Sequence, residues 1–460
     1  MTDIEPDTEL PEDDAYALNA ATVDAIIDAA EASQTDQLRN LLEPLHEADI
    51  ADLIEQISDT EREQLLRVWG ENFNGAVLHE LEEGVRDDIL DLLDKGVLAS
   101  AVQEMETDDL VYLVEDLEEA QQTEILENLE DSDRVAVEAS LQYDEDTAGR
   151  LMSREMVTAP PYWTVGDAID YMRASENLPE SFYKVILIDE RLHVVGTVML
   201  SMIMAHPREE RLIDLADTAP RRIPVDQSDE DVAYAFNQYH IISAPVVDAD
   251  ERLVGVITID DAMEVLEDET EEDMKRLAGL GDEELSDRTW EIVRSRFPWL
   301  AVNLVTAILA SLVIAMFEDT IQALVALAVL MPIVASMGGN AATQTLTVAV
   351  RALATRDLTR SNALRIIRRE AVAGLLNGIA FAVVMGIIGS IWFGPMMLGV
   401  VIGLAMVINL FVAGLSGILI PMALDRAGAD PALASGAFVT TVTDVVGFFA
   451  FLGLAAALLL

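Results

Sequence analysis

The chain has 460 residues, with 83 acidic and 28 basic side chains, five histidines and no cysteine. A formal net charge of −55 argues against nucleic-acid binding, which requires a basic surface. The absence of cysteine excludes disulfides, thiolate metal ligands and a cysteine nucleophile.

The charge is divided unevenly along the chain. Residues 1–290 hold 75 of the acidic and 19 of the basic side chains, whereas residues 291–460 hold 8 and 9. The sequence therefore predicts an acidic soluble part followed by a neutral membrane part. Only three of the basic residues are lysines, and such an acidic composition indicates adaptation to high salt, where ions screen self-repulsion. This adaptation explains most carboxylates without any metal site.

The soluble part begins with an acidic, polar segment, residues 1–14, which we expect to be a disordered tail. It lacks the basic start and apolar run of a signal peptide, so the soluble part is predicted to stay in the cytoplasm. In residues 15–142, Ile50, Leu53, Ile54 and Ile57 form one helical stripe, and the pattern returns at 110–117. Repeated helix pairs predict an all-α superhelical domain.

Residues 143–268 contain an internal duplication. The segments 184–200 and 244–260 each read as a strand, a polar turn, a second strand and the start of a helix, and a helix precedes each of them. We expect two α+β copies, at about 150–207 and 214–268. Residues 269–295 form an acidic, mostly helical connector that Gly279 and Gly281 are expected to interrupt.

Five apolar spans follow, at about 297–317, 321–350, 371–392, 396–424 and 434–460. The loop after the second span carries six arginines, and the approach to the first span carries three. By the positive-inside rule both are cytoplasmic, so the N-terminus lies inside the cell and the C-terminus outside.

The last span carries a single charge, Asp444. An ionised carboxylate at membrane depth costs at least about 2.5 kcal/mol, so it should face a polar cavity or a cation. Thr440, Thr441 and Thr443 add oxygens of the kind that hard cations prefer. The alternative is a protonated or paired aspartate at a helix contact.

The second span holds the segment 331–347, in which Pro332, Gly338 and Gly339 weaken a helix. Asn340 and other polar residues in it predict a pore wall, and close helix packing through small residues is the alternative. Two further polar residues lie in the spans. Asn409 is interpreted as an interhelical hydrogen bond, and Glu370 as an interfacial residue beside Arg368 and Arg369.

Nine carboxylates crowd residues 260–273, and Asp261, Glu264 and Asp268 share one helix face. A divalent cation would relieve their repulsion, but a salt-adapted surface explains them too. Asp108 and Asp109 suit a helix N-cap or a metal. Thr258 and Asp261 suit a nucleotide ribose or a helix cap. No Walker loop, dinucleotide fingerprint, catalytic triad or histidine ligand spacing occurs, so no enzyme is predicted.

Taken together, the motifs resemble the MgtE-type magnesium channels and transporters. The resemblance rests on the segments 45–57, 141–152, 296–304, 337–344, 351–358 and 441–448 and on the duplicated module. It implies a homodimer with an N-terminal helical domain, tandem CBS domains, a connecting plug helix and five membrane helices per subunit.

The resemblance also implies sites. The pore aspartate matches Asp444 and a glycine–asparagine turn matches Gly338, Gly339 and Asn340; with them we group Thr441 and Glu370. The cytosolic magnesium sensor matches Asp108, Asp231, Asp261, Glu264, Glu269, Glu272 and Asp273. Three residues depart from the family pattern: Ala342 replaces a frequent glycine, and His240 and Tyr112 stand where carboxylates are expected.

The sequence thus predicts a channel for Mg²⁺ uptake across the cell membrane, closed by cytosolic Mg²⁺, with ATP as a further candidate ligand of the CBS domains. One alternative is a carrier of divalent cations such as Co²⁺ that is coupled to a proton or sodium gradient. Another is a nucleotide-sensing membrane receptor without transport.

Overall fold

The computed structural model describes residues 18–103, 105–115, 117, 119–175, 178–179, 181–281, 283, 289–434 and 436–460. The predicted tail at 1–14 and connector residues 282 and 284–288 lie outside this description. The chain divides into two compact units, residues 1–267 and 268–460, which are described separately.

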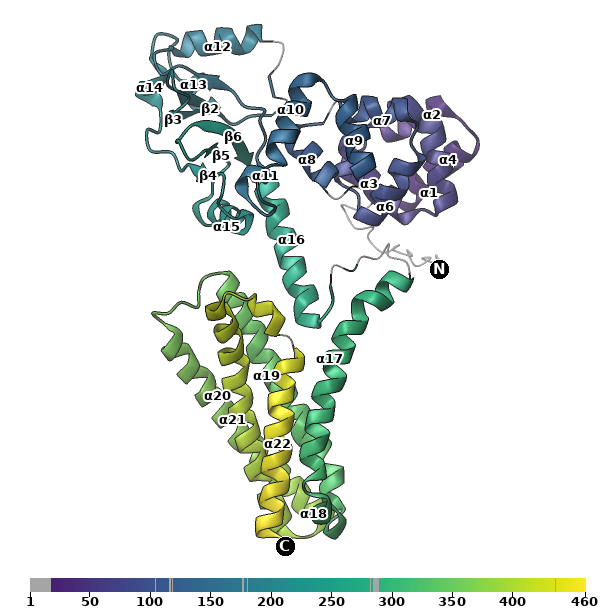
Figure 1. Ribbon diagram of the computed structural model, residues 1–460, viewed down its shortest axis with the longest axis vertical. Helices are drawn as coiled ribbons and strands as arrows, with labels where there is room; N and C mark the ends of the chain where they lie inside the picture. The colour runs from purple at the N-terminus through teal and green to yellow at the C-terminus, as the bar shows by residue number, and fades with distance from the viewer. Residues whose placement is uncertain are drawn as a thin grey trace, which may run out of the picture. The chain divides into compact units, whose positions relative to one another are not determined.

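The first unit begins with short helices packed around one apolar core (Figure 1). The predicted stripe is part of this core, since Leu53 and Ile54 are fully buried. The helices are α1 (Ala20–Glu31), α2 (Thr35–Leu42), α3 (Glu47–Gln56), α4 (Asp59–Trp69), η1 (Gly70–Asn72), α5 (Ala76–His79), α6 (Glu83–Leu92), α7 (Lys95–Val102), α8 (Thr107–Glu115), α9 (Glu119–Asn128) and α10 (Asp131–Ser140).

Two small sheets follow, each with one parallel and one antiparallel strand pair, in the orders β1-β2-β3 and β4-β5-β6. The strands are β1 (Thr158–Ala159), β2 (Lys184–Ile188), β3 (Val194–Met199), β4 (Ile223–Pro224), β5 (Ser243–Val247) and β6 (Leu253–Thr258). The helices around them are α11 (Ala148–Leu151), α12 (Val165–Ala174), α13 (Leu200–Ala205), α14 (Leu212–Leu215), α15 (Asp229–Tyr239) and the start of α16 (Ile259–Ala278).

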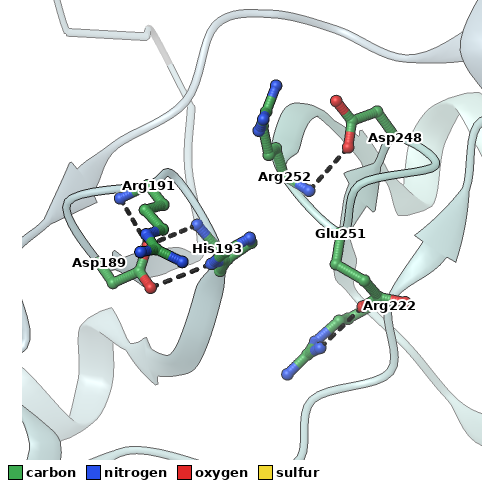
Figure 2. A network of polar contacts seen from close by, with 7 residues as sticks. All are labelled: Asp189, Arg191, His193, Arg222, Asp248, Glu251 and Arg252. Carbon is green, nitrogen blue, oxygen red and sulfur yellow. Dashed lines mark hydrogen bonds and ion pairs between the residues drawn. The ribbon is translucent and has the colours of Figure 1, made fainter.

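The duplication extends to individual hydrogen bonds in the two hairpin turns (Figure 2). In the first turn Asp189 Oδ1 accepts the backbone N–H groups of Arg191 and His193 at 2.8 and 2.9 Å. In the second, Asp248 Oδ1 accepts those of Asp250 and Arg252 at 2.9 and 2.8 Å. The aspartate that opens the turn is therefore a structural residue in both copies.

The second unit contains the end of α16 and five helices that are long and apolar enough to cross a membrane. They are α17 (Thr289–Ala315), α19 (Ala326–Ala354), α20 (Ala363–Phe393), α21 (Met396–Ala427) and α22 (Gly436–Leu458), with the short α18 (Glu318–Ala323) and η2 (Pro431–Ala434) between them. In the bundle α21 contacts α19, α20 and α22, and α17 packs on α22 (Figure 1).

Glycines allow the close packing of these helices. A β-carbon at Gly414 would lie 2.8 Å from the Glu370 carbonyl oxygen on α20, and one at Gly417 would lie 2.7 Å from the Ala342 carbonyl oxygen on α19. The expectation of a turn at Gly338–Asn340 is wrong, because α19 is one continuous helix through these residues. The two glycines instead allow neighbouring helices to approach closely, since Gly338 faces α21 and Gly339 faces α22.

Candidate ion sites

The first candidate site is an acidic cluster in the first unit, formed where α5, α8 and the start of α16 meet. His79, the last residue of α5, lies at its centre. Its Nε2 lies 3.3 Å from Glu264 Oε2 and its Nδ1 lies 3.7 Å from Asp109 Oδ1. Helices far apart in the sequence thus meet at His79, and three predicted sensor residues, Asp108, Asp261 and Glu264, lie in or beside this cluster.

The carboxylates of this cluster repel one another in a partly desolvated place. Burial first, and then the charges of Asp261 and its neighbours, raise the pKa of Asp108 well above its usual value. Burial, together with the charges of Glu155 and Asp109, raises the pKa of Glu106 to about 7. Burial raises the pKa of Asp261 to about 6, although hydrogen bonds from Thr258 oppose the shift. The raised pKa values therefore indicate that the carboxyl groups of this cluster outnumber the positively charged groups near them.

His79 supplies part of the missing positive charge. Burial disfavours its charged form, but the hydrogen bond and charge of Glu264 and the charge of Asp109 outweigh burial and raise the pKa of His79 to about 9. The imidazolium is therefore the resident cation of the cluster. No grouping of three or more histidine, aspartate or glutamate side chains close enough to ligate a metal directly occurs among the described residues. An ion here would be held through its own waters, which is how Mg²⁺ often binds to one or two carboxylates.

Two of the sequence interpretations can now be refined. Asp108 is not an N-cap, because α8 begins at Thr107 and both aspartates lie in its first turn, where the helix dipole favours negative charge. Thr258 caps the start of α16: its backbone N–H and its hydroxyl donate to Asp261 Oδ2 at 2.9 and 3.0 Å. The capping interpretation of Thr258 is therefore realised.

The other predicted sensor residues lie elsewhere. Asp231 lies in the first turn of α15, where its backbone N–H donates to Ser228 Oγ at 3.3 Å. Glu269, Glu272 and Asp273 lie on α16 in the second unit. Glu272 forms an ion pair with Arg276 one turn later.

The end of α16 is docked on the membrane helices of its own unit. Arg276 Nη1 donates to Asp430 Oδ2 at 2.6 Å, in the segment that leads into α22. Leu277 packs against an apolar cluster that includes Leu346 of α19 and Val439 of α22. The α16 helix is therefore attached to the last span by a charge pair and an apolar contact.

This docking also requires a glycine directly after α16. Gly279 has a φ of +77°, and a β-carbon there would overlap the Trp299 indole nitrogen. Trp299 in turn meets Phe438 of α22 edge to face, with ring centroids 6.1 Å apart. The predicted interruption of the connector at Gly279 is thus confirmed. The missing side chain at Gly279 allows Trp299 of α17 to pack directly against the backbone after α16.

The second candidate site is Asp444 on α22. Its side chain is half-buried and forms no hydrogen bond or ion pair with any residue that the structure describes. The hydroxyls of Thr440, Thr441 and Thr443 donate to carbonyl oxygens of their own helix. Their lone pairs remain available as acceptors, while the carboxylate has no protein cation beside it among the described residues.

A recess of about 450 Å³ lies between α19, α20 and α21. Asn340, Gln344, Glu370 and Asn377 line it, and Asp444 does not. Glu370 Oε1 accepts two hydrogen bonds from Arg369, at 3.0 and 3.1 Å. The structure thus brings Asn340 and Glu370 together, but on a side of α19 different from that of Gly339, which faces Thr440 of α22. The predicted pore residues Asn340 and Glu370 therefore line a recess that does not include Asp444.

Comparison with known proteins identifies the chain. Residues 331–454 match the family model of divalent cation transporters, residues 45–146 match the MgtE intracellular N domain, and residues 148–209 and 213–268 match CBS domains. The magnesium transporter MgtE of Enterococcus faecalis is 33% identical over 69% of this chain and 70% of its own length, and that of Thermus thermophilus is 34% identical over 70% and 72%. The chain belongs to the MgtE family.

Solved structures agree with this assignment. The cytosolic domain of the Mg²⁺ channel MgtE in complex with ATP is 26% identical, with a TM-score of 0.50, and is matched over 53% of this chain and 99% of its own. The soluble part of a magnesium transporter, 24% identical with the same TM-score, supports the fold. The predicted fold class is confirmed, and so is the conclusion that this MgtE chain is a multi-pass transporter rather than an enzyme.

Sequence reasoning missed His79 and the Arg276–Asp430 pair. No histidine has ligand spacing, so the pattern gave no role to His79, whose partners Asp109 and Glu264 come from distant helices. Arg276 and Asp430 are 154 positions apart, so no local pattern links them. The only available signals were a lone histidine amid acidic helices and a basic residue at the end of the connector.

Raising the pH in Mg²⁺-free buffer should destabilise the first unit. Asp261 and Glu106 have pKa values raised to about 6 and 7, so the stability they contribute is present at low pH and is lost as the pH rises through those values. His79, with a pKa raised to about 9, loses its contribution as the pH rises through 9. All three act in the same direction. Thermal unfolding of the full chain in EDTA should show a Tm a few degrees lower at pH 8 than at pH 5.5, since about 1 kcal/mol shifts the Tm of a unit this size by roughly 2–4 °C.

Mg²⁺ should reduce this pH dependence, because it binds the deprotonated carboxylates. The variant Glu106→Gln with Asp261→Asn is the control and should show a flatter Tm profile. Equal Tm values at both pH values in the unmodified chain would contradict the electrostatic account.

Reversing the charge at either end of the Arg276–Asp430 pair should loosen the attachment of α16. We expect Arg276→Glu and Asp430→Arg each to raise Mg²⁺ flux at high Mg²⁺, and the double variant to restore closure because the pair re-forms with opposite polarity. The measurement is Mg²⁺ flux into liposomes at several Mg²⁺ concentrations on the cytoplasmic face. Additive effects in the double variant would show that the contact carries no coupling.

Proposed function

We propose that the protein is a homodimeric Mg²⁺ channel that mediates uptake across the cell membrane and closes when cytosolic Mg²⁺ binds its soluble domains. The observation that carries the proposal is Asp444, a carboxylate within a membrane helix without a protein partner among the described residues. Such a group requires either an aqueous passage or a cation. The relatives named as magnesium transporters support Mg²⁺ as that cation.

A second copy of the chain would complete the ion site. One Asp444 and helix hydroxyls that already donate to backbone cannot replace the hydration shell of Mg²⁺. Two Asp444 carboxylates related by a two-fold axis could hold the hydrated ion through its waters, since Mg²⁺ dehydrates reluctantly. This arrangement favours a small, doubly charged and strongly hydrated ion.

The orientation follows from arginines. Six lie between residues 351 and 369, at the end of α19, the start of α20 and the loop between them. We place this loop in the cytoplasm by the positive-inside rule, with the N-terminus inside and the C-terminus outside. The family model of an intracellular N domain, matched over residues 45–146, supports this orientation.

The gating proposal joins the acidic cluster to α16. At high cytosolic Mg²⁺, hydrated ions would relieve the repulsion among Asp108, Asp261 and Glu264 and stabilise the closed arrangement. The α16 helix carries Asp261 and Glu264 in its first turns and Arg276 in its last. Its docked end contacts the segment before α22, so a change imposed at one end of α16 reaches the helix that bears Asp444.

ATP is a further proposal, supported by the ATP complex of a related cytosolic domain. A recess between the CBS copies is lined by Thr258 and by Lys184, whose charge suits a phosphate. The recess is only about 20 Å³, whereas small-molecule sites span roughly 300–1,000 Å³. Nucleotide binding therefore requires this recess to widen.

Asp444→Asn should abolish Mg²⁺ uptake while leaving the protein folded, because the amide keeps the shape and removes the charge that attracts the ion. The measurement is Mg²⁺ uptake into liposomes whose only gradient is Mg²⁺. Asp425→Asn is the matched control, since Asp425 is exposed at the end of α21 and should tolerate the change. Normal uptake by Asp444→Asn would remove the proposed ion site. Uptake that needs an added proton or sodium gradient would favour the coupled carrier instead.

Neutralising the cluster should leave the channel open at high Mg²⁺. In the triple variant Asp108→Asn, Asp261→Asn and Glu264→Gln, we expect the Mg²⁺ concentration for closure to rise at least tenfold, which corresponds to about 1.4 kcal/mol of lost coupling. The matched control neutralises three carboxylates of α1 that lie outside the cluster: Asp24, Asp28 and Glu31. Equal closure in both triple variants would mean that the cluster is only salt adaptation.

A further inference from the structure

Asn409 lies in the middle of α21 and is 1% exposed, at the place where α19, α21 and α22 meet. Its Nδ2 donates to the Val334 carbonyl oxygen of α19 at 2.8 Å. A polar side chain in the middle of a membrane helix needs such a partner. The bond fixes α21 to α19 one turn before Gly338.

Two glycines form the walls around this amide. A β-carbon at Gly338 of α19 would overlap Asn409 Nδ2, and one at Gly447 of α22 would lie 2.8 Å from the same atom. The amide therefore fills a slot that exists only because both facing residues lack a side chain. Sliding α22 past α21 by about one turn would bring Thr443 or Phe451, which share the face of Gly447, to its place and close the slot.

The slot is close to the proposed ion site along the chain of α22. Gly447 follows Asp444 by three residues, less than one helical turn, so the register of Gly447 on the amide fixes the height and rotation of Asp444. The Asn409 Oδ1 atom is buried and accepts no hydrogen bond from the described residues. A β-carbon placed on Gly338 or on Gly447 would lie 3.0 or 3.1 Å from this oxygen. The carbonyl end is thus held by contact, and only the donor end is bonded.

We propose that Asn409 is a positioning residue for transport: its amide, bonded to Val334 and seated between Gly338 and Gly447, sets the register of α22 and thereby the place of Asp444 in the ion passage. This inference rests on the proposed role of Asp444. It also assigns a function to Gly447, which forms one wall of the slot and lies on the same helix as Asp444.

The test uses the full chain in liposomes and compares transport with folding. We expect Asn409→Ala to raise the KM for Mg²⁺ by at least about threefold, because the loss of one interhelical hydrogen bond in a membrane corresponds to a change of this size. We also expect it to lower the ratio of Mg²⁺ flux to Ca²⁺ flux. A purely structural role would lower the Tm and the yield of folded protein but leave both transport parameters of the folded fraction unchanged. The matched control is Ser416→Ala on the same helix, because the buried Ser416 hydroxyl donates only within α21, to Ala413 at 3.2 Å.

A double-mutant cycle with Gly447→Ala tests the slot itself. The new methyl group collides with the amide when Asn409 is present but enters vacated space when residue 409 is alanine. We therefore expect Gly447→Ala to impair transport in the normal background and to be neutral or beneficial beside Asn409→Ala. Equal effects of Gly447→Ala in both backgrounds would overturn the proposal, and so would an unchanged KM and flux ratio in folded Asn409→Ala. If Asn409→Ala does not fold, Asn409→Ser is measured in the same cycle.

The outcome is separable from that of the ion site. Asp444→Asn is measured in parallel. If Asp444→Asn is inactive and Asn409→Ala transports normally, only the positioning role of Asn409 is refuted. Normal transport by Asp444→Asn would remove the ion site itself, whatever the Asn409 variants do.

Discussion

The structure depends on carboxylates that are removed from water without a matching protein cation. Asp444 is the sharpest case, because a membrane helix offers it neither solvent nor an ion pair among the described residues. The acidic cluster presents the same physical problem in the first unit, where His79 compensates only part of the charge of Asp109, Glu264 and their neighbours. In the proposed function a divalent cation supplies the missing positive charge in both places. Transport and its regulation would then use one chemistry, the attraction of a hydrated ion to oxygen ligands.

The α16 helix is the element that makes this shared chemistry useful. It has 20 residues and is therefore about 30 Å long, with cluster carboxylates in its first turns and Arg276 in its last. An uninterrupted helix transmits a displacement because its backbone hydrogen bonds resist bending. The contacts of its end, one ion pair and one leucine in an apolar cluster, are few enough to be released at modest cost. The proposed gating requires such a balance, since a ligand shifts an equilibrium only by its differential affinity for the two states.

Patterns that are local in sequence predict most of the fold. Helical spacing, strand alternation and the duplicated hairpins need no distant contact, and the single charge in the last span marks Asp444 directly. The features that the sequence does not predict are those that depend on which helix faces pack together. The family resemblance implies a turn at Gly338–Asn340, yet bundle packing keeps α19 helical and uses the glycines as contact surfaces. The sequence groups Asn340, Glu370 and Asp444 as pore residues, and only the packed helices show that Asn340 and Glu370 line one recess without Asp444. The role of His79 depends on three helices, which no local pattern brings together.

Burial separates site carboxylates from those of salt adaptation. Among the described groups outside the membrane spans, raised carboxyl pKa values occur at Glu80, Glu106, Asp108, Asp109, Asp229 and Asp261, and burial is the first cause in each. All but Asp229 belong to the cluster around His79 or to its immediate charge neighbours. Carboxylates that serve solubility in salt gain nothing from burial and remain on the surface, where ions screen them. An acidic surface alone does not require five carboxyl groups to be buried near one another, so their convergence around His79 supports the proposed cation site.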